Sequence, residues 1–111
     1  MFNSVNLVGR LAKEFKIFEN ENGKKYVSSS LAIPNNYKNE SGEYETEFIP
    51  FTLFGNIAEK ATEYCKVGDV LGIKGHLSYS NNKLFINTEK FSFLASKSKK
   101  EDLESEKDIK M

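Results

Sequence analysis

The sequence predicts one all-β domain with a single helix, and three observations lead to this fold class. A length of 111 residues gives room for one domain. Over residues 1–95, apolar and polar side chains alternate in short runs with turn residues between them, which is typical of half-buried strands. Only residues 57–66 repeat apolar side chains at the spacing of a helix.

Five runs of alternating residues are predicted to be strands. They span residues 2–15, 24–33, 44–54, 70–80 and 84–94. Gly9 falls inside the first run, where a bulge or a sharp bend is the usual reason for glycine. Pro34 is expected to end the second run and to begin a polar loop over residues 35–43. Asn81 and Asn82 suit a two-residue hairpin turn between the last two runs, because asparagine tolerates positive φ.

The predicted helix covers residues 57–66, with Asn56 as its cap and Gly68 as a stop signal after it. The residues expected on its apolar face are Ile57, Ala61 and Tyr64. Five strands with one helix between the third and the fourth (β-β-β-α-β-β) is the order of the OB-fold, a five-stranded Greek-key barrel. A β-sandwich fits less well because it needs about seven strands and no helix.

Charge and composition limit the classes of function. The chain has 16 Lys and Arg against 16 Asp and Glu, which argues against a polycation that holds nucleic acid by charge alone. The single cysteine, Cys65, excludes an internal disulfide and a cysteine-based zinc cluster. The sequence has neither a membrane-span run nor a secretory signal, so a cytoplasmic location is expected. Residues 1–95 are expected to form the globular domain, and residues 96–111 a charged, disordered tail.

No residue pattern points to catalysis. His76 is the only histidine, and it lies in a strand-like run without a partner motif, so a structural role is expected. Cys65 likewise has no histidine near it in the sequence. An acidic run lacks the spacing of a calcium loop and is expected to be a solvated face. It contains Glu40, Glu43, Glu45 and Glu47. We therefore expect no enzyme, no cofactor and no metal site.

The run over residues 44–54 has two apolar faces, although a small barrel has only one interior. One face carries Ile49, Phe51 and Leu53, and the other carries Phe48, Pro50, Thr52 and Phe54. In the run over 24–33, one face carries Val27, Leu31 and Ile33, and the other carries Ser28, Ser30 and Ala32. Large rings beside small side chains would form a shelf for flat bases, and stacking contributes about 1–3 kcal/mol per base. The alternative is that these rings belong to the core or to a subunit contact.

Three segments resemble the bacterial single-stranded DNA-binding protein family, in one register over about residues 1–95. They are VNLVGRLAKE, TEFIPFTLFGNIAEKATEY and KVGDVLGIKGHL. The resemblance implies an OB-fold that binds single-stranded DNA without sequence preference and assembles as a homotetramer. The family's stacking aromatics correspond to Tyr37, Phe48 and Phe54, and Tyr79 is the candidate for a fourth. The first strand carries apolar residues on both faces, and one set is expected to meet another subunit.

This sequence also departs from the family pattern. The hairpin between the last two strands shrinks to SYSNNKLF, and the tail ends in KDIKM in place of an acidic tip closed by Pro-Phe. Several basic positions of the family hold other residues here. These are Pro50, Asn56, Ser78 and Ser80. Fewer phosphate contacts predict weaker binding and a smaller dependence on salt. A small member from a phage, a plasmid or a reduced genome would show such departures.

The leading prediction is therefore a protein that binds and protects single-stranded DNA during replication, recombination or repair. The basic residues expected to meet phosphates are Arg10, Lys13, Lys24, Lys25, Lys38 and Lys83, with Lys16 near them. The first alternative is an OB-fold accessory module of replication whose aromatic face binds protein. A cold-shock-like binder of single-stranded RNA ranks lower, because that domain lacks the helix between the third and the fourth strand.

Overall fold

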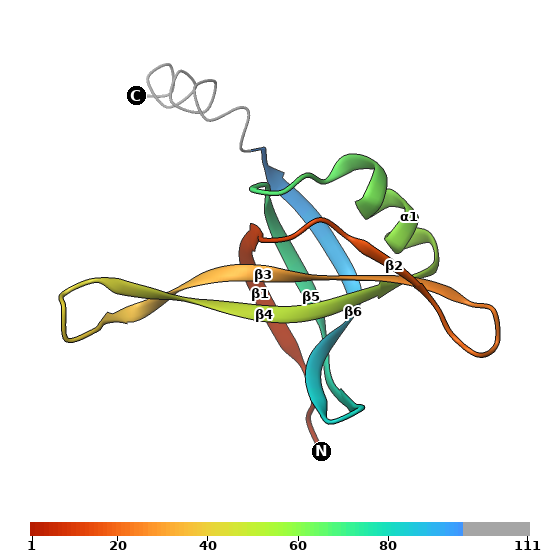
Figure 1. Cartoon of the computed structure of the whole chain (residues 1–111), viewed down its shortest axis with the longest axis horizontal. Coiled ribbons are helices and arrows are strands. Elements are labelled where there is room, and N and C mark those ends of the chain that lie inside the picture. The colour runs from red at the N-terminus through yellow and green to blue at the C-terminus, as the bar shows by residue number, and fades with distance from the viewer. Residues whose placement is uncertain (97–111) are drawn as a thin grey trace.

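The computed structural model describes residues 1–96, which form six strands and one helix (Figure 1). The elements are β1 (Val5–Leu11), β2 (Lys16–Glu19), β3 (Lys25–Lys38), β4 (Tyr44–Phe54), α1 (Gly55–Tyr64), β5 (Val70–Ser80) and β6 (Lys83–Ala95). The tail predicted over residues 96–111 lies outside the described residues, except for Ser96.

Hydrogen bonds between the strands close the sheet into a barrel. The strand order is β1-β5-β6-β4-β3-β2, and β1, at one end, also pairs with β3, the neighbour of β2 at the other end (Figure 1). The β4–β6 pairing is parallel, and the other pairings are antiparallel. This arrangement confirms the predicted OB-fold.

The first predicted strand, over residues 2–15, is divided in the structure. β1 ends at Leu11, and the chain then moves across to form β2, which pairs only with β3. The break has a geometric cause, because one continuous strand would have to follow β5 on one side of the barrel and β3 on the other. Backbone bonds hold the crossing point, where the Leu11 N–H donates to the Asp69 carbonyl and the Ala12 N–H to the Ser30 carbonyl, both at 2.8 Å.

The predicted end of the second strand, before Pro34, was wrong, because β3 continues through Pro34 to Lys38. Proline is tolerated there because β1 pairs with β3 only near residues 31 and 32, so no strand lies on that edge. The register with β4 shifts between Pro34 and Lys38. Only residues 39–43 remain as a turn, in which the Asn39 side chain accepts bonds from the N–H groups of Ser41 and Glu43. β3 and β4 therefore form a long hairpin that projects from the barrel (Figure 1).

α1 spans Gly55–Tyr64, so it starts and stops two residues earlier than the predicted helix of residues 57–66. Its N-cap is Phe54, the last residue of β4, and no side chain caps it. Asn56 lies inside the helix, so the predicted cap was wrong. The strand passes into the helix without a connecting loop, which leaves no position for a polar cap.

The predicted apolar face of α1 is confirmed at Ala61 and wrong at Tyr64. Ala58 and Ala61 are buried, and Cys65, directly after the helix, packs into the same core. Ile57 is half-buried and packs against this core, whereas Tyr64 is 65% exposed. The small residues face inward because the helix packs closely on the barrel, which leaves room for methyl groups but not for a tyrosine ring.

The barrel interior is filled by one core cluster. Its buried members are Leu11, Val27, Leu31, Phe51, Leu53, Ala58, Ala61, Cys65, Leu71, Ile73 and Ile86. Phe51 and Leu53 are each 1% exposed, so of the two apolar faces predicted for this strand, theirs is the one that fills the barrel. The two-residue turn between β5 and β6 is also confirmed, since Asn81 and Asn82 have φ of 51° and 62°.

Gly9 has another role than the bulge or bend expected for it. The β1–β5 register runs through Gly9 without a shift. A Cβ atom there would lie 2.7 Å from the Ala32 carbonyl oxygen and 2.8 Å from the Ile33 Cγ1. Glycine is therefore required because β3 crosses close to β1 where the barrel closes.

Gly75→Ala is expected to lower the free energy of unfolding by about 1–3 kcal/mol or more. A Cβ at this position would lie 2.1 Å from the backbone oxygen of Asn87, so β6 would have to move. Urea unfolding measures the loss. Gly72→Ala is the control in the same strand, because its new Cβ would lie 3.5 Å from the Leu94 side chain, an ordinary contact. Equal stability of the two variants would contradict the prediction.

Candidate functional site

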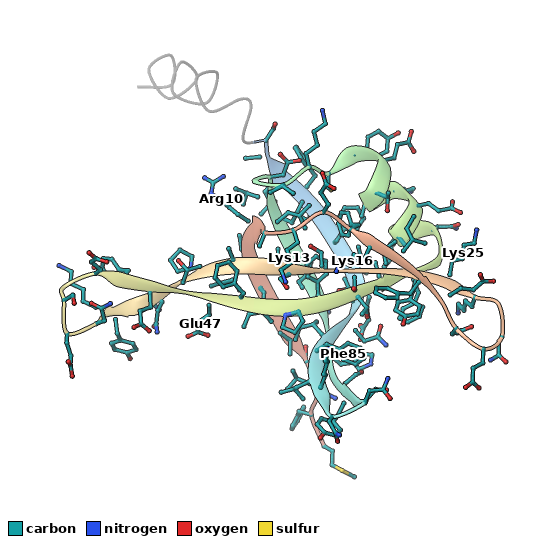
Figure 2. The ribbon with its side chains drawn as sticks, viewed as in Figure 1. Arg10, Lys13, Lys16, Lys25, Glu47 and Phe85 are labelled. Atoms are coloured by element: carbon teal, nitrogen blue, oxygen red, sulfur yellow. The ribbon has the colours of Figure 1, made fainter. Side chains whose placement is uncertain are left out.

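A groove of about 660 Å³ lies on the outer face of β3 and β4. Its floor is made by small side chains of β3 and β4, and the tip of the β5–β6 hairpin forms one wall. Phe85 comes from that hairpin, whereas Lys13 and Lys16 come from the segment between β1 and β3 (Figure 2). The size is within the range of about 300–1,000 Å³ that is typical of ligand sites.

The register between β3 and β4 shows how the floor is built. The facing pairs are Tyr26 with Phe54, Ser28 with Thr52, Ser30 with Pro50 and Ala32 with Phe48. Directly paired residues of an antiparallel ladder point to the same side of the sheet, so these eight share the outer face. Small side chains between rings are the arrangement that the sequence predicts for this face.

Three aromatic rings form a stacked row at one end of the groove. The Tyr26 and Phe54 rings have centroids 5.0 Å apart at an interplanar angle of 28°, and the Phe18 and Tyr26 centroids are 5.4 Å apart at 20°. The row crosses β2, β3 and β4. Tyr26 therefore covers one face of Phe54, and the row offers ring edges and outer ring faces to the groove.

Phe18 and Tyr26 were not predicted from the sequence. Both residues line the groove, and they face each other in the β2–β3 register. The NENG turn at residues 20–23 contained the necessary signal, because a hairpin folded about it places Phe18 opposite Tyr26. The signal was not used because the first strand was predicted to end at Phe15, which left residues 16–19 outside every predicted strand.

Positive charge surrounds the groove. Lys13, Lys16 and Lys83 line it, and the Lys24 ammonium lies 5.7 Å from the centroid of the Phe54 ring. In the described part of the chain, none of these four lysines is held in an ion pair. They are free to contact an anionic ligand, whereas Glu14 is the one carboxylate in the lining.

Other predicted aromatics lie outside the groove. Phe48 is 61% exposed and does not line the groove, although it is the next residue after the lining residue Pro50 on the same face of β4. Tyr37 is 79% exposed on the projecting part of β3. Tyr79 is 68% exposed on the β5–β6 hairpin, where its hydroxyl donates to the Asn82 side-chain oxygen at 3.3 Å. Of the four predicted rings, the groove thus contains only Phe54.

Three of the predicted basic residues also lie elsewhere. Arg10 donates from Nη1 to the Gly68 carbonyl at 2.8 Å. Lys25 lines a different cavity, of about 490 Å³, between β3 and α1, and Lys24 also lines that cavity. Lys38 lies near the end of the β3–β4 hairpin, with its ammonium 5.6 Å from the centroid of the Tyr44 ring. The structure therefore brings Lys13 and Lys83 into the groove and places Lys24 beside it.

The residues considered for other chemistry have structural surroundings. The His76 Nδ1 lies 2.9 Å from the Glu89 Oε2 on neighbouring strands. Burial raises the pKa of the Cys65 thiol, and the charge of Asp69 raises it further. Among residues 1–96, no three His, Cys, Asp or Glu side chains gather as a metal site. Within the same residues, no helix has the length and apolar character needed to span a membrane.

Comparison with known proteins finds similarity over most of the chain. Residues 2–92 match the family described as the single-strand binding protein family. Single-stranded DNA-binding protein B of Bacillus subtilis is 36% identical over 86 residues, which are 75% of this chain and 76% of that protein. Single-stranded DNA-binding protein 3 of Streptococcus agalactiae is 33% identical over 81 residues, 73% of this chain but 59% of that protein.

Two solved structures share the fold. The mitochondrial single-stranded DNA-binding protein Rim1 of S. cerevisiae superposes with a TM-score of 0.71 at 21% identity, covering 86% of this chain and 97% of that one. The Plasmodium falciparum SSB in complex with single-stranded DNA gives a TM-score of 0.69, also at 21% identity, over 85% and 96% of the two chains.

Proposed function

The chain belongs to the single-strand binding protein family, and we propose that it binds single-stranded DNA without sequence preference. Its role would be to protect exposed strands during replication, recombination or repair. The observation that carries the proposal is the groove, which combines a row of aromatic rings with four unpaired lysines on an open face of the barrel. The names of its relatives as single-stranded DNA-binding proteins support it.

Stacking and charge make separate contributions to binding. Bases stack on the rings of Phe48 and of the Phe18–Tyr26–Phe54 row, and each stacked base contributes about 1–3 kcal/mol. The lysines at positions 13, 16, 24 and 83 contact phosphates and release counterions. Every base has an apolar face, so stacking carries no sequence preference. In a duplex those faces are already covered by neighbouring pairs, and this makes the groove selective for unpaired strands.

We also propose that the protein is a homo-oligomer that binds DNA and catalyses no reaction. The support is an apolar patch on the outer face of β1, β5 and β6. Val8 is 59% exposed and Leu94 is 52% exposed. The two side chains lie on either side of Gly72, because a Cβ atom added to that glycine would be within 4 Å of both. A second copy of the chain would cover this patch while leaving the groove on β3 and β4 open.

Fluorescence anisotropy with a labelled oligo-dT strand and with a duplex of equal length tests the function. At low salt, the single strand is expected to bind and the duplex to bind far more weakly. The Lys83→Ala variant is expected to reduce the slope of log K against log salt by about 0.7, the value for one phosphate contact to a single strand. Lys25→Ala is the matched control, because Lys25 faces α1 outside the groove. Equal binding of the two DNAs, or binding of neither, would end the proposal.

A further inference from the structure

The β3–β4 hairpin has two chemically different faces where it projects beyond the barrel. Thr46 faces Pro34 and Phe48 faces Ala32, so the even-numbered residues of β4 continue the outer face that contains the groove. Glu45 and Glu47 alternate with them and point to the opposite side, in line with the core-facing Ile49 and Phe51. Glu47 pairs with Ile33 on that side.

The outer face of this hairpin offers rings and a cation. Phe48 is 61% exposed and Tyr44 is 59% exposed. Tyr44 pairs with Lys38 across the hairpin, and the Lys38 ammonium lies 5.6 Å from the centroid of the Tyr44 ring. A ring with a cation beside it is the same combination that Phe54 and Lys24 form at the groove, where the distance is 5.7 Å.

The opposite face repels phosphate. Glu45 and Glu47 are both exposed there, and neither is held in an ion pair in the described part of the chain. A strand of DNA that leaves the groove beyond Pro50 therefore meets Phe48 and Tyr44 on one side of the hairpin, and Glu45 and Glu47 on the other. Repulsion between like charges favours the side with the rings.

We infer that single-stranded DNA leaving the groove continues along the outer face of the hairpin to a terminal subsite formed by Tyr44 and Lys38. This inference rests on the proposed function. A base stacks on the face of Tyr44 that Lys38 does not cover, and the Lys38 ammonium contacts the adjacent phosphate. Along β4, Tyr44 lies roughly 33 Å from Phe54 at about 3.3 Å per residue, so only a long strand reaches both.

Two lengths of labelled oligo-dT test the subsite, one of about 4 nucleotides, which is too short to reach from Phe54 to Tyr44, and one of about 16 nucleotides, both within the range of site sizes of OB-folds. Tyr44→Ala is expected to weaken binding of the longer strand at least about fivefold and to leave the shorter strand unaffected. Tyr44→Phe is expected to bind both strands like the wild type, because it keeps the ring. Lys38→Ala is expected to lower the salt slope for the longer strand by about 0.7.

Glu45→Ala is the matched control, since it changes the neighbouring residue on the opposite face. It is expected not to weaken binding of either strand. The subsite is refuted if Tyr44→Ala binds the longer strand like the wild type, if it weakens both strands equally, or if Glu45→Ala causes the same loss. In each of these results the wild type still binds, so the proposed function stands. Failure of the wild type to bind either strand would refute both.

Discussion

Replacing Phe48 and Phe54 together by alanine is expected to lower the affinity for single-stranded DNA by about 2–6 kcal/mol, at about 1–3 kcal/mol for each ring. Both residues lie on the outer face of β4, at either end of the small side chains that form the groove floor. Neither belongs to the buried core, so the variant is expected to unfold cooperatively. Anisotropy titration with oligo-dT measures the affinity, and circular dichroism during heating measures the unfolding.

Tyr64→Ala is the control for this double variant. Tyr64 is an exposed ring on α1, at 65% exposure, and it does not line the groove. Its loss is expected to leave the affinity unchanged. If the double variant binds DNA as tightly as the wild type, then the two rings pack against protein and stack on no base.

Phe51→Ala is expected to lower the free energy of unfolding by about 3–5 kcal/mol. Phe51 is 1% exposed in the core, where its ring meets that of Phe15 edge to face, with centroids 6.2 Å apart. A domain of this size is stable by about 5–15 kcal/mol in total, so the loss is a large part of it. Urea unfolding followed by circular dichroism measures the change.

Phe48→Ala is the control for stability, because Phe48 lies three positions away on the opposite face of the same strand. Its free energy of unfolding is expected to change by less than about 1 kcal/mol. The two variants make the same Phe→Ala change on one strand, so a difference in their stability shows that Phe51 serves folding and Phe48 does not. Similar stabilities of the two variants would show that the β4 ring at position 51 is not part of the core.

Much of the fold was predictable because its signals are local. The strands over 44–54 and 70–80 were predicted with the limits that β4 and β5 have. Alternation of side chains placed Phe51 and Leu53 on one face and Phe48 on the other, because the two faces of a strand depend only on its own periodicity, and the structure buries the first face. The turn at Asn81 and Asn82 was predicted from residue preference alone.

The features that were missed depend on contacts between distant segments. The division of the first strand follows from closing the barrel against both β5 and β3, and no pattern within residues 2–15 marks it. The buried face of α1 depends on where the helix rests, which selected Ala58 over Tyr64. The row of rings required the β2–β3 register, without which Phe18 and Tyr26 are two unrelated aromatics.

The Phe18–Tyr26–Phe54 row makes one end of the groove preorganised. Each ring is restrained by its neighbour across the strands before any ligand arrives. Immobilising a free side chain at an interface costs about 0.5–1.5 kcal/mol of conformational entropy. In the proposed complex this cost falls on the exposed Phe48 and is largely absent at Phe54, so the two phenylalanines contribute unequally even where each stacks on one base.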